Sequence, residues 1–87
     1  MKLMVFCVKD RATETFGTPM FLVAKGQAIR SFTDEVNRSA ADNQLFLHPD
    51  DFDLYELGFW SSDDGSFDVG KPTVICRGKD VQIREMN

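Results

Sequence analysis

The middle of the chain lacks basic residues. None of the ten lysines and arginines lies in residues 39–70, although this range holds eight aspartates and glutamates. The formal charges of residues 1–38, 39–70 and 71–87 are +2, −8 and +2, which together give the net charge of −4. Affinity for nucleic acid rests largely on lysines and arginines that displace counterions from phosphates. The charge distribution therefore argues against a protein that coats DNA with its whole surface.

Residues suited to metal or nucleophilic chemistry are also scarce. The 87 residues include two cysteines, Cys7 and Cys76, and one histidine, His48. A disulfide scaffold of this size normally carries four or more cysteines, so we expect two buried, reduced thiols rather than a disulfide or a metal site. His48 lies close to several aspartates, but the Pro49 that follows it is typical of the first position of a helical turn. We expect no catalytic residue, no metal and no cofactor, and hence no enzyme.

Long apolar runs are absent as well. No segment approaches the ~20 apolar residues that cross a membrane, so we expect no membrane contact. The six apolar residues after Lys2 are ended by Lys9, Asp10 and Arg11, which is typical of a strand and too short for a signal peptide. A chain of 87 residues is expected to form one domain, residues 1–87, with a small core.

The apolar pattern predicts an α+β domain, a small, mainly antiparallel sheet with one amphipathic helix packed on one face. Strands are expected in short apolar runs at residues 3–8, 20–23, 54–60, 66–69 and 73–76, with a last edge strand at 81–83. Asp64-Gly65 predicts a hairpin turn. Strict alternation along 54–60 would divide its side chains between two faces, with Tyr55, Leu57 and Phe59 on one and Leu54, Glu56, Gly58 and Trp60 on the other.

One helix is predicted at residues 26–38. Apolar residues recur there at helical spacing and form a single stripe, made of Ala28, Ile29, Phe32 and Val36. Arg30, Asp34 and Arg38 lie on the opposite side at intervals of four residues, where neighbouring charges would pair. We expect Phe32 to lie in the core and Arg30 to lie in solvent.

Two candidate binding surfaces follow from the charges and the aromatic residues. Aromatic side chains on a sheet can stack on the bases of single-stranded nucleic acid, although core packing is the competing interpretation of these rings. The candidate nucleic-acid-binding residues lie outside the acidic range and are Arg11, Lys25, Arg30, Arg77, Lys79 and Arg84. The candidate partner-binding residues form an acidic lobe with two aromatic residues and are Asp50, Asp51, Asp53, Tyr55 and Trp60.

Several short patterns resemble a known phage protein. Asp10-Arg11 follow the first strand, Pro19-Met20-Phe21 begin the second, and Ala28-Ile29-Arg30-Ser31-Phe32 run toward Val36-Asn37 in the helix. The most specific pattern, His-Pro-Asp-Asp-Phe-Asp-Leu-Tyr-Glu-Leu-Gly-Phe, spans residues 48–59. Together they resemble the small nonstructural (ORF5-type) protein of the gokushoviruses, single-stranded DNA phages of the Microviridae. The resemblance covers residues 1–70 and leaves residues 71–87 as a divergent tail.

The resemblance implies a non-enzymatic accessory protein in the host cytoplasm, acting in replication or packaging of the single-stranded DNA genome. Single-stranded DNA and a phage replication or capsid protein are the partners it implies. The matching polar positions are Arg11, Arg30 and His48, and no catalytic residue is carried over. The alternative is a module that binds a phage or host protein through the acidic lobe.

The small core also predicts self-association. Apolar residues occupy both faces of the expected strands 3–8 and 54–60, and one helix covers only one face. A homo-oligomer, most simply a dimer, would cover the other face or an edge strand. The rival is a monomer in which residues 73–83 fold back over that face.

Overall fold

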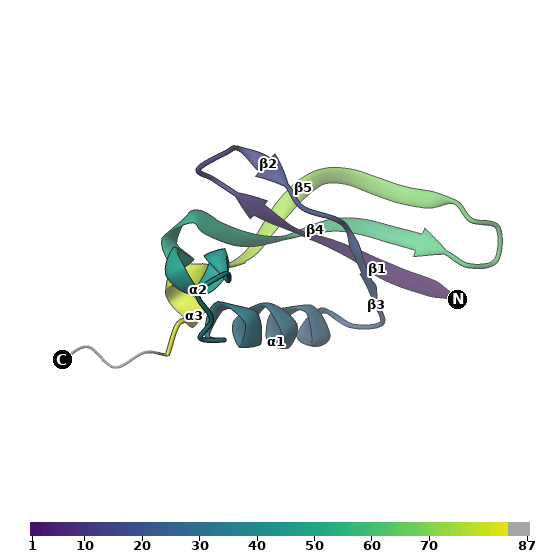
Figure 1. The fold of residues 1–87 in the computed structure, drawn as a ribbon. Helices are drawn as coiled ribbons and strands as arrows, with labels where there is room; N and C mark the ends of the chain where they lie inside the picture. Colours follow the sequence, from purple (N-terminus) through teal and green to yellow (C-terminus); the bar gives the residue numbers. More distant parts are fainter. Residues whose placement is uncertain (84–87) are drawn as a thin grey trace.

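A computed structural model describes residues 1–83 as one curved antiparallel sheet lying on a long helix (Figure 1). The strands are β1 (Lys2–Asp10), β2 (Thr15–Phe16), β3 (Met20–Leu22), β4 (Phe52–Ser61) and β5 (Phe67–Arg77). Their order is β2-β1-β4-β5, and β3 also pairs with β1. This architecture confirms the predicted α+β class with a mainly antiparallel sheet.

Four helical segments accompany the sheet. They are α1 (Lys25–Val36), α2 (Gln44–Leu47), the 3-10 turn η1 (Pro49–Asp51) and α3 (Gly78–Val81). The predicted turn at Pro49 is confirmed. The prediction of an edge strand at 81–83 is wrong, because the chain forms α3 up to Val81 instead. A segment this short has no periodicity that would distinguish a strand from a helical turn.

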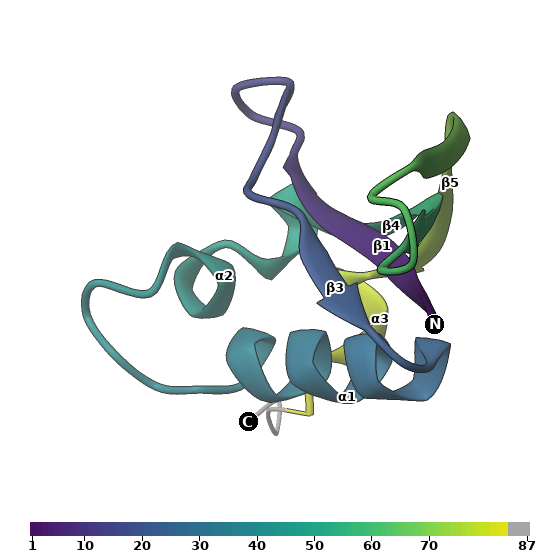
Figure 2. The same cartoon turned by 90° about the vertical axis from the view of Figure 1, so that its right-hand side faces the viewer.

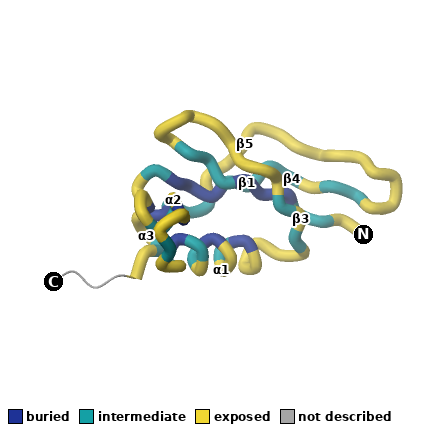
Figure 3. The backbone as a smooth tube through the Cα atoms, in the orientation of Figure 1, coloured by how far each residue is buried: buried dark blue, intermediate teal, exposed yellow. Residues whose placement is uncertain are grey.

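The apolar stripe of α1 makes the core. Ala28, Phe32 and Val36 are buried and pack with Phe6 and Leu54 of the sheet. Figure 3 shows the buried residues of α1 and of the central strands facing one another. The predictions that Phe32 lies in the core and that Arg30 is exposed are both confirmed.

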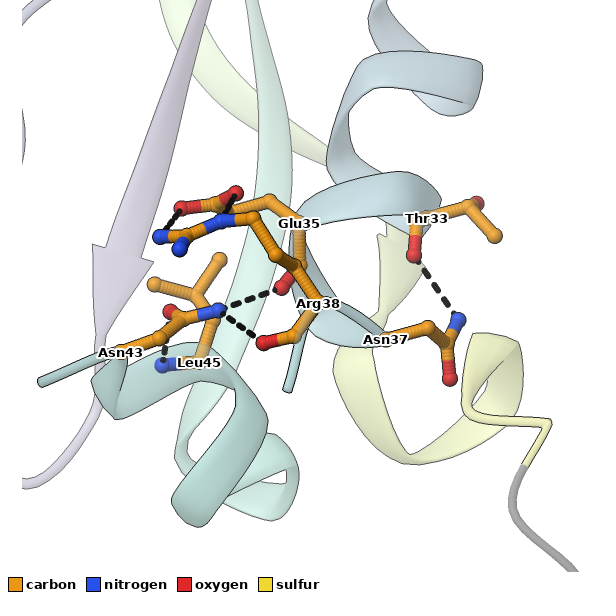
Figure 4. A network of polar contacts seen from close by, with 6 residues as sticks. All are labelled: Thr33, Glu35, Asn37, Arg38, Asn43 and Leu45. Carbon is orange, nitrogen blue, oxygen red and sulfur yellow. Dashed lines mark hydrogen bonds and ion pairs between the residues drawn. The ribbon is translucent and has the colours of Figure 1, made fainter. Parts of the chain in front are cut away.

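Polar contacts fix both ends of α1. At its start, the Gln27 side chain accepts hydrogen bonds from the backbone N–H groups of Val23 and Ala24. At its end, Arg38 forms two hydrogen bonds with the Glu35 carboxylate (Figure 4), at 2.7 and 2.8 Å, and these lower the pKa of Glu35. The partner of Arg38 is therefore Glu35, three residues away, and not Asp34 as the four-residue spacing predicted.

A β-bulge in β4 changes which side chains share a face. Phe6 of β1 pairs with Glu56 and Val5 pairs with Gly58, so Leu57 has no partner in the register. One extra residue in a strand reverses the alternation beyond it. Tyr55 and Trp60 consequently lie on the same face, and the predicted division of residues 54–60 into two faces is wrong.

The outer face of the sheet is the face turned away from α1. Figures 1 and 2 show α1 beneath β1 and β4, with β2 and β5 rising on the opposite side. The expected strands at 66–69 and 73–76 are parts of one strand, β5, interrupted by a bulge at residues 70–72. Residues 78–81 form α3, which contacts α1 and η1. In the described residues, therefore, the chain after β5 covers the core and leaves the outer face open.

Candidate nucleic-acid interface

The first aromatic cluster, Phe16 and Tyr55 with Lys9, lies at one end of the outer face. The two rings meet edge to face with centroids 5.2 Å apart. The Lys9 ammonium lies 5.6 Å from the Phe16 centroid and 6.0 Å from the Tyr55 centroid, within the range of a cation–π contact. Lys9 pairs with Phe16 across β1 and β2, which accounts for their common face.

The second aromatic cluster, Phe21, Trp60 and Phe67, lies toward the other end of the same face. The Phe21 ring centroid is 5.7 Å from that of Trp60 and 6.1 Å from that of Phe67. Phe67 stands opposite Trp60 in the pairing of β4 with β5. Phe67 is 57% exposed and Phe21 is 41% exposed, so these rings present apolar surface to solvent instead of filling the core.

A buried carboxylate lies beside the first cluster. Asp53 is 1% exposed, and its Oδ2 lies 3.2 Å from Nε of Arg11 and 3.5 Å from a guanidinium nitrogen of Arg77. Arg11 also donates a hydrogen bond to the Asp50 carbonyl. Neither Asp53 oxygen accepts a hydrogen bond from the described residues, so the two ion pairs are what balance its charge. Both guanidinium side chains are 42% exposed and remain accessible from outside.

Basic side chains gather at one end of the outer face. At this end of the face, Lys9 contacts the aromatic rings, and Arg11 and Arg77 pair with the buried carboxylate of Asp53. Elsewhere on the sheet the acids face α1. Glu56 pairs with Lys25 of α1 at 3.3 Å, and Asp68 stands opposite Phe59, on the α1 side.

The acidic residues do not form one lobe. Asp50 and Asp51 lie in η1, whereas Asp63 and Asp64 lie in the β4–β5 hairpin, where Asp63 pairs with the N-terminal amino group at 2.8 Å. Asp53 is buried between its two arginines and is not part of an exposed acidic surface. The expected acidic lobe is therefore divided between two ends of the molecule, because β4 runs between them.

The structure brings together only some of the predicted basic residues. Arg11 and Arg77 meet at Asp53, while Lys25 and Arg30 belong to α1 and Lys79 to α3. Arg84 lies outside the described residues. Arg30 borders a groove of about 770 Å³ between α1 and β3, on the side away from the outer face.

Three aromatic residues of the two clusters escaped the sequence analysis. Phe16 lies outside the strands expected from the sequence, and Phe21 and Phe67 lie in the strands expected at 20–23 and 66–69, but none of the three was named as a candidate. Strand pairing brings these rings to the clusters, because it places Phe16 opposite Lys9 and Phe67 opposite Trp60. A sequence without a known register does not reveal that pairing.

The groups considered for chemistry lie apart. His48 is exposed and borders a hollow of about 320 Å³ with Asp51, while Asp53 lies buried. Within residues 1–83, no group of three or more His, Cys, Asp or Glu residues is placed to hold a metal ion. Nor is any helix in that range long and apolar enough to span a membrane.

Both cysteines are free. Burial raises the pKa of the Cys7 thiol. Burial also raises the pKa of Cys76, with a further contribution from the nearby charges of Asp53 and Asp80. The prediction of buried, reduced thiols holds for Cys7, and Cys76 is only partly buried.

Comparison with known proteins gives two matches. The family model described as Phage ORF5 protein matches residues 3–81. Protein ORF5 of Chlamydia phage 1 is 32% identical over 84 residues, which cover 91% of this chain and 88% of the relative. No solved structure matches the chain. The family match includes residues 71–81, which the sequence analysis sets apart as a divergent tail.

Proposed function

The chain belongs to the phage ORF5 protein family, and on this premise we propose that it is a non-enzymatic accessory protein that binds single-stranded DNA weakly. It would act in the host cytoplasm during replication or packaging of the phage genome. The observation that carries this proposal is the outer face, which holds two exposed aromatic clusters and three basic side chains at the first of them. Single-strand binding proteins combine these two features, because exposed rings stack on unpaired bases and cations contact the backbone.

The charge of the whole chain limits this binding. Phosphates approaching the outer face meet Lys9, Arg11 and Arg77, but the acids at both ends of the molecule oppose a longer contact. A site with few phosphate contacts has low affinity and a shallow dependence on salt. We therefore expect weak binding that prefers single strands, since bases within a duplex are not free to stack on protein rings.

Trp60 provides the test, because it is the only tryptophan and it lies in the second aromatic cluster. Titration with a single-stranded oligothymidylate should quench its fluorescence, and a duplex of equal length should do so much less. The titration is repeated at two salt concentrations. The Arg30→Ala variant is the control, since Arg30 lies on α1 and should leave the titration unchanged. Tight duplex binding that barely changes with salt would contradict the proposal.

The alternative function is a module that binds a phage or host protein. The groove between α1 and β3 favours it, because its floor is apolar (Val8, Met20, Leu22, Phe32 and Leu45) and β3 pairs only with β1 among the described residues. The acids of η1 and of the β4–β5 hairpin add charged surface at either end. Affinity capture from infected cells, with and without nuclease, distinguishes the two functions. A phage replication or capsid protein, or a host protein, retained after nuclease treatment would support the alternative.

A further inference from the structure

We propose that the outer face contains two separate base-stacking sites, one at each aromatic cluster, and that a single-stranded segment of about five nucleotides spans both. This inference rests on the proposed function and specifies its site. The ligand is single-stranded DNA without base specificity, because stacking on a ring is available to every base.

The distance between the clusters sets the length of the segment. Tyr55 stands opposite Cys7 of β1, and Trp60 stands opposite Leu3. Four residues of extended strand correspond to about 13 Å. A stacked strand advances by about 3.4 Å per nucleotide, so about four steps, or five nucleotides, join the two clusters. A dinucleotide would reach only one of them.

Between the clusters, the outer-face residues of β1 are Val5 and Cys7, each only 2% exposed, so the proposed segment would cross a closely packed part of the sheet. Gly58 lies there, opposite Val5 of β1 and Val69 of β5, and presents no side chain. A Cβ at Gly58 would overlap the Asp68 carbonyl oxygen, and its φ of +146° is one that other residues rarely adopt. The backbone of β5 fills the space that a side chain at Gly58 would need, so the glycine lets β5 approach β4 closely beside the bulge.

The two sites differ in charge. Lys9 lies over the rings of the first cluster, and Arg11 and Arg77 are near it around Asp53. No ion pair or cation–π contact of the described residues adjoins the rings of the second cluster. We infer that phosphate contact belongs to the first site and that the second acts by stacking alone. The basic side chains of the first site are the reason to propose a polyanion as the ligand of this face.

The experiment measures the affinity of oligothymidylates of two to ten nucleotides for the full chain by fluorescence anisotropy. The variants are Phe16→Ala for the first cluster, Phe67→Ala for the second and Lys9→Gln for the cation. Phe59→Ala is the matched control, because Phe59 is an exposed phenylalanine on β4 (37%) that faces the α1 side. Melting curves of each variant verify that it is folded.

Affinity should rise with length up to about five nucleotides and then level off. Phe16→Ala and Phe67→Ala should each lose about tenfold in affinity for the longer oligonucleotides. Lys9→Gln should flatten the salt dependence by about 0.7 in the logarithmic slope, whereas Phe67→Ala should leave that slope unchanged. Phe59→Ala should bind like the unaltered chain.

Different failures overturn different statements. DNA binding that survives both phenylalanine variants, or that does not depend on length below five nucleotides, would overturn the two-site arrangement and leave the proposed function standing. Absence of binding to any oligonucleotide would overturn the proposed function and the two sites together. Dissociation of an oligomer by Phe16→Ala and Phe67→Ala, with no DNA bound, would assign the face to a second copy instead.

Discussion

Asn43 is a buried polar side chain that joins two helices. Its amide nitrogen donates hydrogen bonds to the carbonyl oxygens of Glu35 and Arg38, both at 2.8 Å, and its amide oxygen accepts one from the backbone N–H of Leu45 at 3.2 Å (Figure 4). The residue is 4% exposed. One side chain thereby bonds a carbonyl in the last turn of α1, the Arg38 carbonyl just beyond that helix and one N–H in the first turn of α2, where backbone groups have no partner within the helix.

We predict that Asn43→Ala lowers the free energy of unfolding by about 1–3 kcal/mol, because it leaves buried backbone groups without partners. Urea unfolding of the two chains measures this difference. Gln44→Ala is the control, since Gln44 is exposed and its substitution should cost less than about 0.5 kcal/mol. An equal loss of stability for both substitutions would show that the hydrogen bonds of the Asn43 side chain do not stabilise the fold.

Asp53 affects both stability and the charge of the outer face. We predict that Asp53→Asn lowers the free energy of unfolding by about 1–2 kcal/mol, a modest loss because the half-exposed Arg11 and Arg77 regain water. The same change frees two cations, so affinity for single-stranded oligonucleotides should increase and its salt dependence should steepen. Unfolding and anisotropy measurements on one preparation check both effects. Weaker DNA binding by a folded Asp53→Asn chain would contradict the assignment of the outer face as the DNA-binding surface.

At the scale of the element, the contribution of α1 to stability comes from its buried face. We predict that Phe32→Ala costs about 3–5 kcal/mol, enough to unfold most of so small a domain, because it removes a ring buried against Phe6 and Leu54. Arg30→Ala should cost less than about 0.5 kcal/mol, since Arg30 is exposed. Thermal melting followed by circular dichroism compares the two, and similar losses would contradict the assignment of the two faces.

The predictability of each element follows from the range of the interactions that define it. The helix at residues 25–36 and the turn at Pro49 were predictable, because apolar spacing and a proline signal are local. The bulge at Leu57 was not, since it exists only in the register of β4 against both of its neighbours. For the same reason, Tyr55 and Trp60 could be named as candidate residues from the sequence, but it could not be predicted that they lie on the same face of the sheet. Arg11 and Arg77 were named separately, and the buried Asp53 that brings them together could not be predicted from spacing.

At the scale of the whole molecule, the open outer face also bears on self-association. Phe16, Phe21, Phe67, Val69 and Val74 are each at least 40% exposed, all on this face. We predict a homodimer in the absence of DNA, because paired faces would remove these side chains from water. Light scattering at tens of micromolar measures the mass, and addition of an oligonucleotide should shift it toward the monomer if both ligands use the same face. A monodisperse monomer without DNA would refute the dimer.

The pairing of β1 with β4 has a consequence for how the chain is made. Phe6 emerges from the ribosome early but is covered only when Leu54 of β4 and the helix between them have followed. Val81, near the end of the chain, also packs on this core, and its carbonyl accepts a hydrogen bond from Asn37 at 3.0 Å. The first strand therefore depends on segments that are synthesised much later than itself. A chain that ends before Gly78 lacks these contacts, so it should be less stable than the chain that includes α3.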